Sequence, residues 1–169
     1  MKIFLYAILF LLVLTSCDKQ EDKGPEIVVN GTWEIIEIVS PLEGTRLFKD
    51  EIDYTETYIF LNGGTFLKFN SKTDATLWGT YKIIEPSEIQ VKEIHAIISL
   101  NFDLSELRSA ASQFEDVTDE FCWTCPSLGS FVYGWGPTER LFLYIDNRLS
   151  NPGPCCFKDL PTYNYSKIN

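Results

Sequence analysis

The chain has 169 residues, of which 45% are hydrophobic and 22% are charged. This composition excludes a disordered protein and a protein embedded in the membrane throughout. Fourteen Lys and Arg against 24 Asp and Glu give a formal net charge of −10. An acidic chain without a basic run also excludes a nucleic-acid partner, because that binding depends on neutralising phosphates. The length predicts a single domain with its own core.

The N-terminus has the pattern of an export signal. Met1 and Lys2 precede an apolar run at residues 3–14, which is too short to span a bilayer but has the length of a signal-peptide core. We therefore expect residues 1–16 to be a signal peptide that is removed.

The end of this run is Leu14-Thr15-Ser16-Cys17, an aliphatic residue, two small residues and a cysteine. It resembles the lipobox of bacterial lipoproteins, in which the cysteine sulfur is lipidated and the chain is cut before the cysteine. The resemblance implies a mature protein that is held to the outer membrane through Cys17. An ordinary secretory signal that contains a cysteine is the alternative.

Residues 17–25 form the predicted lipidated tether, with a Lys and paired acids directly after the cysteine. This stretch resembles the surface-export signal of Bacteroidetes-type lipoproteins. Display on the cell surface and display on the periplasmic face both remain open. The folded domain is expected over residues 26–169.

Strand patterns follow from Gly31 onward. Runs rich in β-branched and aromatic residues, separated by turn residues, predict strands at 32–40, 55–61, 65–69, 76–84, 88–93 and 95–101. The turn Asn62-Gly63-Gly64 predicts an antiparallel hairpin. Leu67 and Phe69 alternate with Lys68, which predicts that the two apolar side chains face the core. Glu34 and Glu37 are three apart, so either a bulge realigns the faces or one Glu points inward.

The pattern changes after residue 102. Apolar residues recur at helical spacing, and Asp103 with Glu106 forms a possible capping box, so the sequence predicts one α-helix at about 103–117. A possible strand at 130–133 and a strand at 140–146 follow.

Three Gly-Thr-aromatic triplets begin at Gly31, Gly64 and Gly79. Their order after a lipobox resembles the lipocalin-like domains of bacterial lipoproteins. The resemblance implies an all-β fold, an antiparallel up-and-down barrel of about eight strands, whose interior holds one small apolar ligand or is filled by side chains. It also implies that Trp33 closes the barrel beneath a basic side chain, with Arg148 as the expected partner and Lys158 next.

Lipidation of Cys17 leaves four cysteines, in the pairs Cys122/Cys125 and Cys155/Cys156. Adjacent cysteines bridge each other only with strain, so two crossed disulfides between the pairs are the simplest prediction. A redox-active pair at Cys122-Trp123-Thr124-Cys125 and a four-thiolate zinc site are the alternatives.

No catalytic motif stands out, and the single histidine, His95, lies in a predicted strand, so we expect neither an enzyme nor a cofactor. The leading hypothesis is a lipid-anchored lipocalin-like protein that binds a small apolar or amphipathic ligand. The alternative is an accessory subunit of a cell-surface assembly, with a filled barrel and an aromatic contact loop at Phe131, Tyr133 and Trp135. A thiol-disulfide protein is third.

Overall fold

The computed structural model describes residues 27–86, 93–111, 137–152 and 160–168. The predicted signal peptide, the whole of the predicted tether, and the predicted strands at 88–93 and 130–133 lie outside these ranges, apart from Glu93. The described strands are β1 (Gly31–Ser40), β2 (Thr45–Phe48), β3 (Glu56–Leu61), β4 (Thr65–Asn70), β5 (Ala75–Ile84), β6 (Ile94–Phe102), β7 (Thr138–Tyr144), β8 (Arg148–Asn151) and β9 (Thr162–Ile168).

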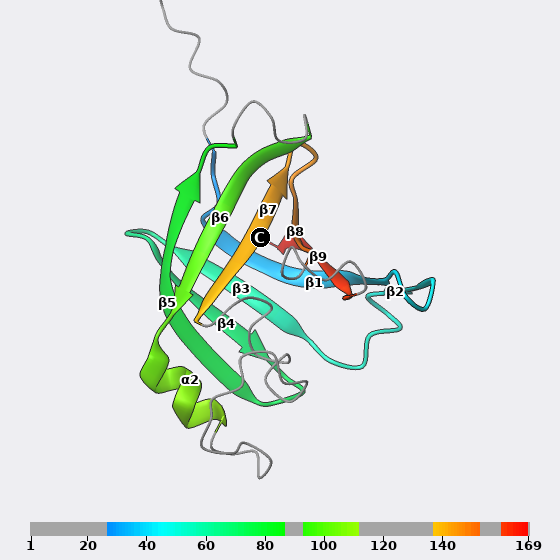
Figure 1. Ribbon diagram of the computed structural model, residues 1–169, viewed down its shortest axis with the longest axis horizontal. Helices are drawn as coiled ribbons and strands as arrows, with labels where there is room; N and C mark the ends of the chain where they lie inside the picture. The colour runs from blue at the N-terminus through cyan, green and yellow to red at the C-terminus, as the bar shows by residue number, and fades with distance from the viewer. Residues whose placement is uncertain (1–26, 87–92, 112–136, 153–159, 169) are drawn as a thin grey trace, which may run out of the picture.

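The strands form one antiparallel sheet in the order β2-β1-β3-β4-β5-β6-β7-β8-β9, and pairing of β1 with β9 closes the sheet on itself (Figure 1). β1 pairs with β3 through Gly31–Glu34 and with β9 through residues 32–39. Strand β2 pairs only with the second half of β1 and projects beside the barrel. The prediction of an all-β, up-and-down barrel of eight strands with one helix is confirmed.

A bulge in β1 settles the position of its two glutamates. The register with β9 shifts between Ile35 and Glu37. Ile35 is buried, whereas Glu34 binds Lys49 at 2.6 Å and Glu37 binds Arg46 at 3.2 Å near the surface. The bulge therefore lets one strand keep its apolar side chains inward although its acids are three residues apart.

The prediction for the faces of β4 was wrong. Lys68 points into the barrel and is 1% exposed, whereas Leu67 and Phe69 lie on the outer face and are only partly buried. The physical reason is that Lys68 lies between the buried carboxylates of Glu56 and Glu139, which compensate its charge.

Side chains occupy the barrel interior. Edge-to-face aromatic contacts link its strands, among them Phe66 with Phe102 at 5.0 Å and Tyr58 with Tyr165 at 5.1 Å between ring centroids. Other fully buried interior side chains are Trp33, Ile35, Phe60, Ile98 and Leu100. The described barrel is thus packed around a core of large rings.

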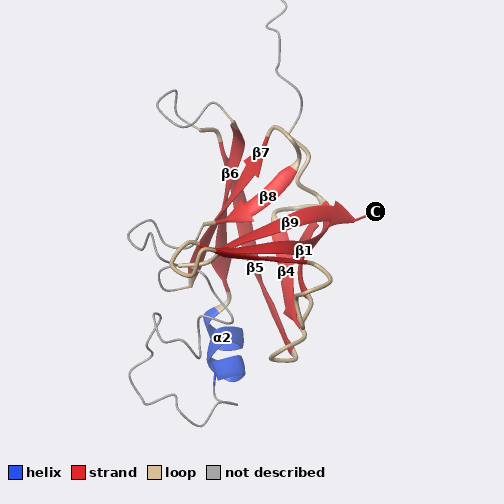
Figure 2. Ribbon diagram, turned by 90° about the vertical axis from the view of Figure 1, so that its right-hand side faces the viewer, coloured by secondary structure: helices blue, strands red, loops and turns tan. Residues whose placement is uncertain are grey.

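Helix α2 (Leu104–Ala111) follows β6 directly and lies at one end of the barrel (Figures 1 and 2). Its N-cap is Asp103, whose Oδ1 accepts hydrogen bonds from the backbone N–H groups of Ser105 at 2.8 Å and Glu106 at 3.3 Å. Leu107 and Ala110 are buried against the barrel. The helix occupies the first part of the predicted range, and residues 112–117 lie outside the described part of the chain.

Candidate functional site

Most residues that the sequence singled out lie outside the described ranges. These are the lipidation residue Cys17, the four candidate disulfide residues Cys122, Cys125, Cys155 and Cys156, and the aromatic stretch at 131–135. Their roles stay predictions. Trp33, Arg148 and His95 are described.

Trp33 lies in the hydrophobic core of the barrel. It is 1% exposed, and its indole Nε1 donates a hydrogen bond to the carbonyl of Val29 at 2.8 Å. The cation over its ring is Lys167, with Nζ 5.7 Å from the ring centroid. Lys167 stands directly opposite Trp33 in the β1–β9 ladder, which places both side chains on the same face.

The expectation that Arg148 is the cation partner of Trp33 was wrong. Arg148 is paired with Ser166, one position away from Lys167, and its guanidinium lies 4.6 Å from the ring centroid of Tyr144. Successive residues of a strand face opposite sides of the sheet, so this register directs Arg148 away from Trp33.

A polar network crosses the interior, and we call it the interior polar cluster. Its members, all at most 4% exposed, are Glu56, Tyr58, Lys68, Asn70, Glu139, Asn151 and Tyr165. Lys68 Nζ lies 3.6 Å from Glu56 Oε1 and 3.5 Å from Glu139 Oε2. The ammonium group therefore bridges two carboxylates from opposite sides of the barrel.

Neutral side chains complete the interior polar cluster. Glu139 accepts hydrogen bonds from Tyr58 and Asn151, and Glu56 accepts them from Tyr165 and from Asn70, the latter at 2.8 Å. No buried side-chain nitrogen or oxygen lacks a partner in the described part of the chain. Because these polar groups already bind one another, the interior polar cluster presents no hydrogen-bonding group to a ligand. We interpret it as a network that stabilises the barrel.

Tyr165 is held in its protonated state. Burial raises the pKa of its phenol well above 10.0, and the negative charge of Glu56 raises this pKa further. The phenol is therefore a hydrogen-bond donor to Glu56 at any physiological pH, and it acts as a fixed support of that carboxylate.

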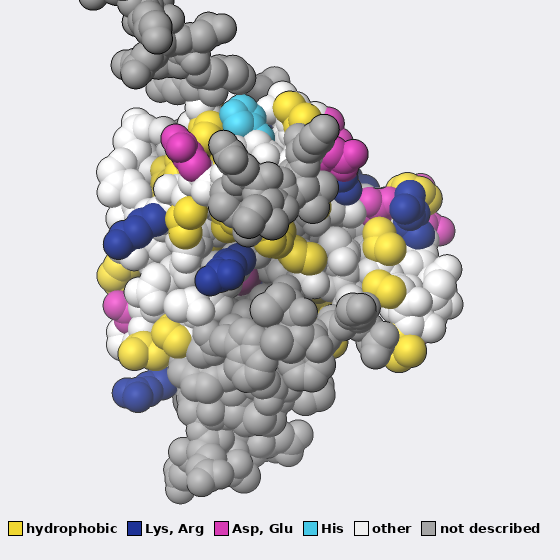
Figure 3. Space-filling model, turned by 45° about the horizontal axis from the view of Figure 1, so that its top comes forward, with side chains coloured by type: hydrophobic (Ala, Val, Ile, Leu, Met, Phe, Trp, Pro, Cys, Tyr) yellow, Lys and Arg dark blue, Asp and Glu magenta, His cyan; other side chains and the backbone are white. Residues whose placement is uncertain are grey.

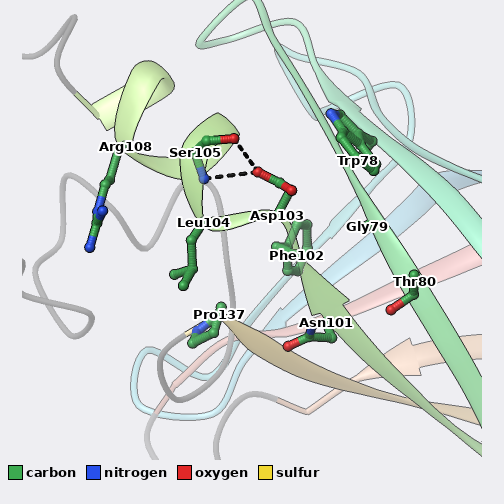
Figure 4. A pocket seen from close by; sticks show the side chains of 10 residues that line it. All are labelled: Trp78, Gly79, Thr80, Asn101, Phe102, Asp103, Leu104, Ser105, Arg108 and Pro137. Atoms are coloured by element: carbon green, nitrogen blue, oxygen red, sulfur yellow. Dashed lines mark hydrogen bonds between the residues drawn. The ribbon is translucent and has the colours of Figure 1, made fainter.

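A second feature is an open pocket on the outside of the barrel, which we call the α2 pocket. It has a volume of about 510 Å³ and lies between the outer face of β5 and β6 and the start of α2 (Figure 4). Its lining is Trp78, Gly79, Thr80, Asn101, Phe102, Asp103, Leu104, Ser105, Arg108 and Pro137. The volume is in the range of pockets that hold small ligands.

The α2 pocket exposes a large indole. Trp78 is 45% exposed, although its strand neighbour Leu77 is buried in the core. Gly79 allows β5 to approach β6 closely, since a Cβ there would lie 2.2 Å from the carbonyl oxygen of Asn101. The close approach puts Trp78 beside Asp103, whose backbone N–H donates to the Trp78 carbonyl at 3.0 Å.

Asp103 carries a fixed negative charge in the α2 pocket. A hydrogen bond from the Ser105 hydroxyl lowers its pKa below 3.8, and the backbone N–H groups of Glu106 and Ser105 lower it further. The carboxylate is consequently ionised at neutral pH.

No group of His, Cys, Asp and Glu suited to a metal ion occurs among the described residues. His95 lies at the β6 bulge between Ile94 and Ala96, where it is half-buried. The helices of the described ranges include none with the length and apolar character to cross a membrane.

Fold and site together define a closed antiparallel β-barrel with a packed interior and an external pocket beside its helix. Comparison with protein-family models, with curated proteins and with solved structures gave no significant match.

Proposed function

We propose that this chain is a lipid-anchored outer-membrane protein of lipocalin-like type that binds a small amphipathic ligand in the α2 pocket and catalyses no reaction. The observation that carries the ligand site is the pocket itself, which sets the exposed Trp78 and Leu104 beside Asp103 and Arg108. Apolar surface with a few polar groups is the usual lining of a ligand pocket.

The barrel interior supports this location indirectly. The sequence led us to expect a ligand held by inward-facing side chains. The described interior is instead filled by aromatic rings and by the interior polar cluster, whose members bind one another. A ligand there would have to displace packed side chains, whereas the α2 pocket is already open.

The proposed anchor depends on the sequence Leu14-Thr15-Ser16-Cys17. Two or three acyl chains on Cys17 would hold the protein stably at a membrane surface, because each buried methylene contributes about 0.8 kcal/mol. Replacement of Cys17 by Ser should move the protein from the membrane fraction to the soluble fraction and abolish incorporation of labelled palmitate. Retention of the label in the Cys17→Ser variant would refute the anchor.

A second candidate function is an accessory subunit of a surface assembly. The filled interior favours it, and so does the projecting β1–β2 hairpin, where Leu42, Leu47 and Phe48 are 74%, 41% and 51% exposed. Figure 3 shows hydrophobic side chains between charged ones on this projection, at the right of the view. Apolar side chains exposed on a projection are typical of protein contacts.

The two candidates are separated by a matched pair of substitutions. Leu104 in the α2 pocket and Leu47 in the hairpin are 44% and 41% exposed, so replacement of either by Asp removes a similar amount of exposed apolar surface. Binding of a polarity-sensitive dye that Leu104→Asp abolishes and Leu47→Asp leaves unchanged would support the ligand function. Dye binding that only Leu47→Asp abolishes would overturn it in favour of the accessory subunit.

A further inference from the structure

We infer that the α2 pocket recognises an organic cation, whose ammonium group lies between the indole face of Trp78 and Oδ2 of Asp103. The inference rests on the proposed function for the location of the ligand, and it adds the chemical class of the ligand.

The sheet register brings the two side chains together. Gly79 pairs with Phe102 and Thr80 with Asn101, so Trp78 is opposite Asp103 at the end of the ladder. The hydrogen bond from the Asp103 N–H to the Trp78 carbonyl, at 3.0 Å, continues that pairing. Side chains of directly opposed residues start about 4.5–5.5 Å apart at Cβ and project from the same face. An ammonium group can therefore contact both at once.

The two carboxylate oxygens of Asp103 have different roles. Oδ1 caps helix α2 through the bonds from Ser105 and Glu106. Oδ2 makes no hydrogen bond to any described residue and lies on the side of Trp78 (Figure 4). The cap thus fixes the carboxylate while it leaves one charged oxygen for a ligand.

Trp78, Asp103 and the net charge of the chain favour a positive ligand over a neutral or negative one. The indole face attracts cations through its quadrupole, and the attraction is strongest for Trp. Among the described residues of the lining, Arg108 is the one cation, and its side chain is directed away from Trp78 (Figure 4). The net charge of −10 adds a long-range attraction for cations.

Leu104 and Pro137 supply apolar surface along the same pocket. Figure 4 places them on the side of the pocket away from Trp78. A cation with a short apolar tail therefore matches the lining from end to end. This chemistry is shared by free amphiphilic amines and by the quaternary ammonium headgroups of lipids.

The test is calorimetric titration of the full chain carrying Cys17→Ser with hexyltrimethylammonium, hexanol and hexanoate, which share a tail and differ in charge. We expect hexyltrimethylammonium to bind about tenfold more tightly than hexanol, as a cation–π contact with an adjacent charge provides. Asp103→Asn is the decisive variant, because Asn caps helices as well as Asp and only the charge is lost. The Asp103→Asn substitution should lower the affinity for hexyltrimethylammonium by about three- to tenfold. Trp78→Leu should have an effect of similar size.

Glu106→Gln is the control, since it removes the neighbouring acid of α2, which does not line the pocket. It should leave the affinity for hexyltrimethylammonium unchanged. Equal affinities for the three probes, or an Asp103→Asn variant that binds the cation as tightly as the parent, would overturn this inference but not the proposed function. Absence of binding by all three probes would overturn the proposed function as well.

The source of the cation is distinguished by a vesicle experiment. Co-sedimentation with phosphatidylcholine vesicles that Asp103→Asn abolishes would assign the site to lipid headgroups. Binding of soluble hexyltrimethylammonium without co-sedimentation would assign it to free amines.

Discussion

Replacement of Lys68 by Met tests the account of the barrel interior. Lys68 is 1% exposed and is the cation that lies between Glu56 and Glu139, at 3.6 and 3.5 Å. Met has a similar length and is apolar, so the variant fills the same space without the charge. Two buried carboxylates would then face each other across the interior without the ammonium between them.

The expected loss of stability follows from the burial of Lys68 and its two carboxylate partners. Removal of one partner from a buried ion pair costs about 3–5 kcal/mol, because the other charge stays in a low-dielectric interior. For a chain of this size the loss lowers the midpoint of thermal unfolding by about 2–4 °C for each kcal/mol. Urea unfolding followed by circular dichroism measures the free energy, and the slope against urea shows whether the folded state stays compact.

Two further variants make this prediction specific. Lys82→Met removes an exposed lysine from the neighbouring strand β5 and should change the free energy of unfolding by about 0.5 kcal/mol or less. Replacement of Glu56 and Glu139 by Gln in the Lys68→Met background should recover much of the loss, because the uncompensated charges are gone. A Lys68→Met variant no less stable than Lys82→Met would refute the role of Lys68 as the bridging cation.

Three other perturbations probe other parts of the barrel. Gly79→Ala would place a Cβ 2.2 Å from the carbonyl oxygen of Asn101, so we expect a loss of about 2 kcal/mol or more in urea unfolding, and parent-like stability would contradict the close approach. Trp33→Phe removes the indole hydrogen bond to the Val29 carbonyl and should cost about 1–3 kcal/mol, again by urea unfolding. The raised pKa of Tyr165 means that the unfolded chain loses this proton first, so stability should fall as pH rises above 10.0. Tyr165→Phe should flatten that alkaline decline, and an unchanged slope would show that other groups cause it.

Most of the fold could be predicted from sequence because its strands carry strong local signals. The runs that begin near Thr32, Thr55, Thr65 and Thr76 contain β-branched and aromatic residues between turn residues, and the structure has strands β1, β3, β4 and β5 there. Strand β7 spans Thr138–Tyr144 rather than 140–146, a shift of the boundaries alone.

The strands that were missed lack such signals. Strand β2 (TRLF) is fully exposed and β8 (RLSN) has four residues with three polar ones, so neither shows the alternation of a half-buried strand. Strand β9 (TYNYSKI) alternates, but its apolar face consists of tyrosines. This segment is a strand because it pairs with β1 and so closes the barrel. A pairing between residues far apart in the chain cannot be detected from a short stretch of sequence.

The candidate sites depended on the faces of the strands, and there the sequence misled. Leu67 and Phe69 look like core residues beside Lys68, yet the carboxylates of Glu56 and Glu139, which lie in other strands, reverse the assignment. Trp78 was not singled out from the sequence, and it is 45% exposed in the structure. A signal was present in its neighbour Gly79, because a glycine inside a strand marks close backbone contact, and the alternation of side chains along β5 puts Trp78 on the face opposite to the buried Leu77.

The same backbone contact connects the packed interior to the outer pocket. Gly79 holds β5 against β6, and this places Phe102 inward against Phe66 while Trp78 and Asp103 stand side by side outside. A recognition site on rigid strands keeps its geometry better than one on loops, because little side-chain and backbone freedom remains to be lost on binding. The interior polar cluster contributes to that rigidity through satisfied hydrogen bonds across five strands. A filled barrel is therefore compatible with ligand binding, since its packing can preorganise a pocket on its outer face.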